Sequence, residues 1–104
     1  MEELQAPRAN LYVLFEGTRG DRRPVSARPR APRSGIKVRV LVEQEALHDQ
    51  RVFLLYRRGD ADMVIGASAR REILEELRNK LGRSAASYEI SEIPVLKTAP
   101  AAQA

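Results

Sequence analysis

The stretch SARREILEELRNKLG, residues 68–82, has the clearest helical period in this 104-residue chain. Its apolar residues recur at the spacing that lines one side of a helix, and they are Ile73, Leu74, Leu77 and Leu81. Ser68 can cap the start, and Gly82 can adopt the left-handed conformation that ends a helix. We therefore predict a helix over residues 68–81, with Leu77 at the centre of its buried face. A helix of this length is marginal alone in water, so it must pack on a sheet.

Short apolar segments on both sides of this helix have the composition and alternation of strands. We expect these strands at residues 11–15, 36–43, 51–57, 63–66 and 87–95. The first is apolar on both faces, which is typical of an interior strand. The second and third should pair as an antiparallel hairpin, across a loop that could hold a short helical turn at residues 43–48.

The predicted fold is an α+β two-layer sandwich, in which one helix covers one face of an antiparallel or mixed sheet of four to five short strands. The expected order is a strand, a long basic loop, two strands, a further short strand, the helix and a last strand. Residues 1–104 form one domain on this reading, because the length and the 43% hydrophobic content fit a single globular unit. Residues 1–9 are expected to be a flexible leader and residues 97–104 a disordered tail.

The composition also limits the chemistry. The chain has no cysteine and one histidine, which excludes a disulfide framework, a thiolate nucleophile and a zinc site of the His/Cys type. We expect no metal and no cofactor. The first residues lack an apolar signal segment, and the longest apolar run, residues 11–15, is far too short to span a membrane. The sequence therefore predicts a soluble, cytoplasmic protein without membrane contact.

The positive charge is concentrated in one segment. The chain carries a net charge of +4, but residues 19–33 alone carry +5, which leaves the remainder near neutral. The basic residues of this segment are Arg19, Arg22, Arg23, Arg28, Arg30 and Arg33. Three prolines and almost no large apolar side chains indicate that residues 17–35 form a mobile loop, which could bind phosphates. A solvated insertion without function is the alternative.

A second group of anion-binding candidates lies at the predicted helix start, where Ser68, Arg70 and Arg71 would surround free backbone amides. The alternative for Arg71 is an ordinary ion pair with Glu75, one turn along the helix.

A single helix leaves the other sheet face open, and this face should serve as an interface. The residues expected there are Tyr12, Leu14, Leu41, Phe53 and Leu55. A second protein surface, such as another copy of the chain in a homodimer, suits this patch better than stacked bases, because the chain has few aromatic residues.

No pattern points to an enzyme. His48 lies between Glu45 and Asp49, but no serine has the surroundings of a catalytic nucleophile and no glycine-rich phosphate loop follows a strand. Arg-Gly-Asp occurs twice, at residues 19–21 and 58–60, where a turn explains it. We expect a non-enzymatic binding protein whose arginine-rich loop engages nucleic-acid phosphates without reading sequence. The alternative is a dimeric protein-interaction adaptor or inhibitor that uses the open sheet face, with the basic loop on an acidic protein surface.

Overall fold

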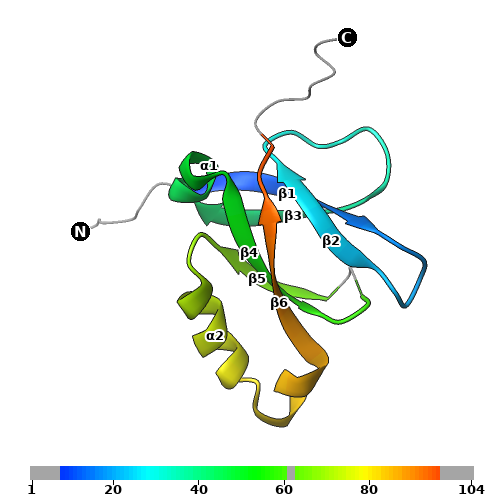
Figure 1. Ribbon diagram of the computed structural model, residues 1–104, viewed down its shortest axis with the longest axis vertical. Coiled ribbons are helices and arrows are strands. Elements are labelled where there is room, and N and C mark those ends of the chain that lie inside the picture. Colours follow the sequence, from blue (N-terminus) through cyan, green and yellow to red (C-terminus); the bar gives the residue numbers. More distant parts are fainter. Residues whose placement is uncertain (1–7, 61–62, 97–104) are drawn as a thin grey trace.

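The computed structural model describes residues 8–60 and 63–96, which form a small α+β domain (Figure 1). The α+β class predicted from the sequence is confirmed. In chain order the elements are β1 (Arg8–Glu16), β2 (Arg23–Arg28), β3 (Ile36–Glu43), α1 (Glu45–Asp49), β4 (Arg51–Arg57), β5 (Val64–Ser68), α2 (Arg71–Asn79), the 3₁₀-helix η1 (Gly82–Ser87) and β6 (Tyr88–Pro94). The predicted leader, residues 1–9, overlaps the start of β1 at Arg8 and Ala9. Its other residues and the predicted tail, residues 97–104, lie outside the described residues.

The strands form two three-stranded antiparallel sheets, with the orders β2-β1-β3 and β5-β4-β6. In each sheet the strand that comes first in the sequence, β1 or β4, lies in the centre between the other two. The two halves of the chain therefore share one pairing scheme. The prediction that the first strand is interior is confirmed. The prediction of one sheet with four to five strands is wrong, because the strands divide between two sheets.

The predicted hairpin between residues 36–43 and 51–57 is also wrong. β3 pairs with β1, where Val40 lies opposite Leu11, and β4 pairs with β5 and β6. The helix α1 separates β3 from β4 and carries the chain from one sheet to the other, ending at Gln50 with a positive φ of 60°. Alternation of apolar residues identifies a strand but contains no information about its partner.

The predicted loop at residues 17–35 contains the strand β2, which the sequence analysis missed. Its residues Ser26 and Ala27 are buried, and Pro24 is buried beside a register shift in the pairing with β1. Proline is tolerated there because β2 is the end strand of its sheet and a bulged position does not need every backbone N–H. Small side chains and proline therefore concealed a strand that belongs to the core.

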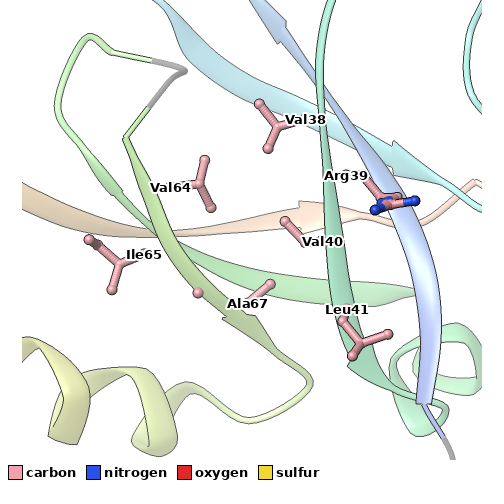
Figure 2. A pocket seen from close by; sticks show the side chains of 8 residues that line it. Val38, Arg39, Val40, Leu41, Val64, Ile65 and Ala67 are labelled. Carbon is pink, nitrogen blue, oxygen red and sulfur yellow. The ribbon is translucent and has the colours of Figure 1, made fainter.

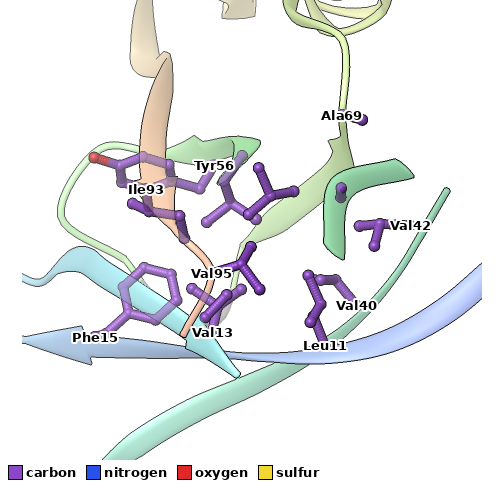
Figure 3. Close-up of a cluster of buried hydrophobic side chains, with 13 residues drawn as sticks. Leu11, Val13, Phe15, Val40, Val42, Tyr56, Ala69, Ile93 and Val95 are labelled. Atoms are coloured by element: carbon purple, nitrogen blue, oxygen red, sulfur yellow. The ribbon is translucent and has the colours of Figure 1, made fainter. Parts of the chain in front are cut away.

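The larger core lies between the two sheets (Figure 3). Leu11, Val13 and Phe15 project from β1 toward the second sheet, and Phe15 meets Tyr56 edge to face with 6.0 Å between the ring centroids. A smaller core lies between the second sheet and α2, where Leu74 packs with Phe53, Leu55 and Tyr88.

The helix therefore covers the sheet face opposite to the predicted one. Phe53 and Leu55 are only 7% and 0% exposed, so placing them on an open interface was wrong. Period-2 alternation divides strand residues into two faces without showing which face meets the helix.

The helix itself is shorter than predicted, because Ser68 ends β5 and α2 begins at Arg71. Leu74 is its fully buried residue, whereas Leu77 is partly buried. Gly82 has a φ of +61°, as predicted for the end of the helical segment.

Candidate nucleic-acid interface

The β2-β1-β3 sheet packs one face against the second sheet, and we call its opposite face the outer face. Residues directly opposite each other in an antiparallel pair project to the same side. Tyr12 lies opposite Arg28 on β2 and Arg39 on β3, and the next row contains Leu14, Ser26 and Lys37. Since the alternate residues of β1 point into the core, these side chains lie on the outer face. Tyr12 and Leu14 are partly exposed, and Leu41 on the same face is 51% exposed.

The cations of this sheet and its adjoining loop have no partner within the described part of the chain. This applies to the side chains of Arg23, Arg28, Arg30, Arg33, Lys37 and Arg39, none of which forms an ion pair or hydrogen bond with a described residue. The Nε atoms of Arg22 and Arg28 are buried without a hydrogen-bond partner. A ligand could not reach these buried atoms, but each guanidinium carries further N–H donors besides Nε.

The arginines of the second half are arranged differently. Arg51 pairs with Glu92 at 3.1 Å, and its guanidinium also lies 5.7 Å from the ring centre of Phe53. Arg58 pairs with Glu89 at 3.1 Å. These ion pairs balance two cations of the second half, whereas Arg57 at the end of β4 forms no ion pair with a described residue.

The structure distributes the six predicted loop arginines around β2. Arg19 lies in the turn between β1 and β2, and Arg22 immediately precedes β2. Arg23 and Arg28 are the first and last residues of β2, and Arg30 and Arg33 follow in the connection to β3. Lys37 and Arg39 lie on the same face but are not among the residues predicted to bind phosphate. Their alternation with Val38 and Val40 was the signal that they share a face opposite the core.

In the second predicted group, Ser68, Arg70 and Arg71, the first two residues lie near a carboxylate of the chain itself, that of Glu43. The Ser68 hydroxyl donates to Oε2 of Glu43 at 2.9 Å, and the Ala69 N–H donates to Oε1 at 2.8 Å. Arg70 pairs with Glu45, and Arg71 pairs with Glu75 at 3.0 Å, which was the alternative weighed for Arg71. The structure thus places Ser68 and Arg70 near the Glu43 carboxylate, whereas Arg71 is paired with Glu75.

Glu43 connects the end of β3 to the end of β5, and its ionised form is favoured. Burial alone would raise the pKa of its carboxyl group. Hydrogen bonds from the N–H groups of Ala69 and of Glu43 itself, the Ser68 hydroxyl and the charge of Arg70 together lower this pKa below the ordinary value of 4.5.

Acid should therefore weaken the fold through Glu43. A pKa that is lower in the folded state gives stability that is present above a pH of about 4.5 and is lost as the pH falls through the folded-state pKa. At neutral pH, Glu43→Gln should reduce the free energy of unfolding by about 1–3 kcal/mol, because a charged acceptor is lost beside buried donors. Below the folded-state pKa the two proteins should converge.

Urea denaturation across this pH range measures the difference. Glu76→Gln, at an exposed position on α2, is the matched control and should leave the pH dependence unchanged. A constant difference between wild type and Glu43→Gln at all pH values would show that the ionised carboxylate has no special role.

The described residues contain no group of three His, Cys, Asp or Glu side chains that could hold a metal ion. Across the same residues, every helix is too short or too polar to cross a membrane. No protein-family model, curated protein or solved structure matches the chain.

Proposed function

We propose that this protein binds nucleic-acid phosphates through the outer face and its adjoining loop, without reading base sequence. The observation that carries the proposal is the gathering of unpaired cations on one face of the first sheet. Arg51, Arg58 and Arg71 are paired with carboxylates, whereas Arg28 and Lys37 on the outer face have no partner among the described residues. Neighbouring cations without counterions repel one another, and a phosphate backbone relieves this repulsion.

The shape of the outer face favours backbone contacts over base readout. It is a sheet surface, and reading the major groove commonly requires a helix or a two-stranded ribbon that enters it with polar side chains. Arginine can bind phosphate through two parallel hydrogen bonds, which gives affinity without sequence information. Tyr12 lies between Arg28 and Arg39 and offers a surface on which an unpaired base could stack, so single strands should bind as well as duplexes.

Salt dependence tests the proposal. Each neutralised phosphate adds about 0.9 to the slope of log affinity against log salt on duplex DNA, so four to five engaged cations predict a slope magnitude of about 3–5. Arg28→Ala and Lys37→Ala should each lower this magnitude by about 0.9. Fluorescence anisotropy with a labelled duplex of arbitrary sequence measures it.

Arg51→Ala and Arg58→Ala are the matched controls, because they remove the same charge from residues already paired with Glu92 and Glu89. Their slopes should equal that of the wild type. Absence of binding at low salt, or an equal loss in all four variants, would refute the proposal.

A protein-interaction adaptor or inhibitor is the second candidate, and the exposure of Leu41 on the outer face favours it. An acidic protein surface would then cover the same cations, and a homodimer could bury Tyr12 and Leu14. Sedimentation velocity measures the dimer directly. The cytoplasmic location remains a prediction from the sequence.

A further inference from the structure

The strand β2 carries cations of the candidate interface but buries no large apolar side chain. Its buried residues are Pro24, Ser26 and Ala27. The two sheets meet differently at β3 and β5, where Val38, Val40 and Val64 lie between the strands and pack with the larger core (Figure 2). Little hydrophobic burial therefore holds β2 against the second sheet, and its position there depends on other contacts.

Backbone contacts join β2 to the second half of the chain at both of its ends. At the last residues of β2, Ala27 forms a parallel bridge with Val95, and the Leu96 N–H donates to the Ala27 carbonyl at 2.8 Å. Just before the first residue of β2, Arg22 forms a bridge with Gly59, and the Arg22 N–H donates to the Gly59 carbonyl at 3.4 Å. This second contact joins the turn after β1 to the turn after β4.

These two turns contain the two Arg-Gly-Asp tripeptides. In each turn the aspartate N–H donates to the carbonyl three residues earlier, from Asp21 to Thr18 at 2.8 Å and from Asp60 to Arg57 at 3.0 Å. Gly20 and Gly59 occupy the third position of their turns with φ of +86° and +78°, which is the pattern of a type II turn. The repeated tripeptide therefore corresponds to a repeated turn.

The two turns touch at their glycines. A methyl group built onto Gly59 would lie 2.5 Å from the carbonyl oxygen of Gly20, about 1 Å closer than ordinary van der Waals contact. This oxygen belongs to the backbone, which cannot rotate away as a flexible side chain can. A methyl group on Gly20 would meet no atom of a described, non-adjacent residue within 4 Å. Glycine at position 59 therefore allows the two backbones to approach.

We propose that Gly59 is a positioning residue for the nucleic-acid interface, because it holds the start of β2 against the second sheet. This inference rests on the proposed function. The contact fixes Arg22 directly and fixes Arg23, the first residue of β2, through the chain. Both arginines belong to the group predicted to bind phosphates. Gly59 lies in the other half of the sequence and acts on the interface only through them.

Loss of this contact should differ from loss of a charge. A looser turn removes no cation, so the number of neutralised phosphates and the salt slope should stay the same. The start of β2 would have to become ordered when nucleic acid binds, and this ordering consumes conformational entropy. The affinity should therefore fall while the salt slope stays constant.

Hydrogen exchange tests the contact between the turns without nucleic acid. In the unmodified protein the Arg22 amide should exchange more slowly than in an unfolded chain, because it donates to the Gly59 carbonyl. Gly59→Ala should speed the exchange of the Arg22 and Arg23 amides by about tenfold or more. Gly20→Ala is the matched control, because it brings alanine to a similar positive φ in the same tripeptide without the close approach. Its effect on these amides should be much smaller.

Anisotropy titrations with the labelled duplex test the positioning role. Gly59→Ala should weaken binding by about tenfold at low salt and leave the salt slope unchanged. Gly20→Ala should bind almost as tightly as the unmodified protein. Arg28→Ala provides the contrast, because it removes a cation and should lower the slope. Circular dichroism checks that each variant is folded.

Several results would overturn the inference. They are unprotected exchange of the Arg22 amide in the unmodified protein, equal effects of Gly59→Ala and Gly20→Ala, and a lower salt slope for Gly59→Ala. Unfolding of Gly59→Ala while Gly20→Ala stays folded would also overturn it, because Gly59 would then be needed for the fold itself. Absence of nucleic-acid binding by the unmodified protein would refute the proposed function and the positioning role with it, whereas the exchange data would still decide whether the turns are joined.

Discussion

Replacing Ala27 by aspartate is expected to unfold the protein. Ala27 is fully buried on β2, lies opposite Val13 on β1 and forms the bridge to Val95. A carboxylate at this position would be buried in an apolar core without a cation beside it. An uncompensated buried charge costs about 3–5 kcal/mol, which is comparable to the total stability of many small domains.

Ala31→Asp is the matched control, because Ala31 is exposed in the connection between β2 and β3. Its free energy of unfolding should stay within about 0.5 kcal/mol of the wild type. Circular dichroism and urea denaturation of both variants provide the measurement. Equal stability of the two would mean that residues 23–28 do not belong to the core and that the segment is the mobile loop predicted from composition.

The contrast between β2 and the other strands shows what sequence patterns encode. Residues 36–43 and 51–57 were identified because large apolar side chains alternate with polar ones, which is a local property of the chain. The buried residues of β2 are Pro24, Ser26 and Ala27, and none of these is large and apolar. Its burial depends on how closely β1 and the end of β6 approach, and this is a property of the assembled fold.

Strand partners and helix placement depend on the same long-range information. The pairing of β3 with β1 joins residues that are far apart in the sequence. Alternation of apolar and polar residues does not show which face of a strand the helix will cover. This explains why the predicted hairpin was wrong and why Phe53 and Leu55 were placed on the open face. Helical periodicity correctly located α2 but could not show which sheet face the helix would cover.

The sequence shows where the basic residues of the candidate interface lie, but it does not show which basic residues form ion pairs with carboxylates. The concentration of arginines in residues 19–33 is visible in the sequence, and so is the alternation that sets Lys37 apart from Val38. The pairing of Arg51 with Glu92 joins residues on two different strands, and it appears only after the second sheet has formed. The outer face emerges as a candidate because comparable pairing is absent among its described residues.

Leu74→Ala should reduce the free energy of unfolding by about 2–5 kcal/mol, because it removes a fully buried side chain and leaves a cavity between α2 and the second sheet. The close approach of helix and sheet limits how far this cavity can collapse. A methyl group built onto Gly66 of β5 would lie 3.4 Å from Leu77 and 3.7 Å from Leu74. Ile73→Ala, next to Leu74 but exposed, should change stability by no more than about 0.5 kcal/mol.

Urea denaturation of Leu74→Ala, Leu77→Ala and Ile73→Ala also determines how α2 is rotated on the sheet. The periodicity of residues 68–82 favours Leu77 as the central contact, whereas the structure buries Leu74 more deeply. A larger loss for Leu74→Ala than for Leu77→Ala would support the observed rotation, because the cost follows the volume of the unfilled cavity. The reverse order would place Leu77 at the centre and turn Leu74 toward the edge of the contact. In that case Phe53 and Leu55 would be less well covered, and the second sheet would again offer an apolar surface to a partner.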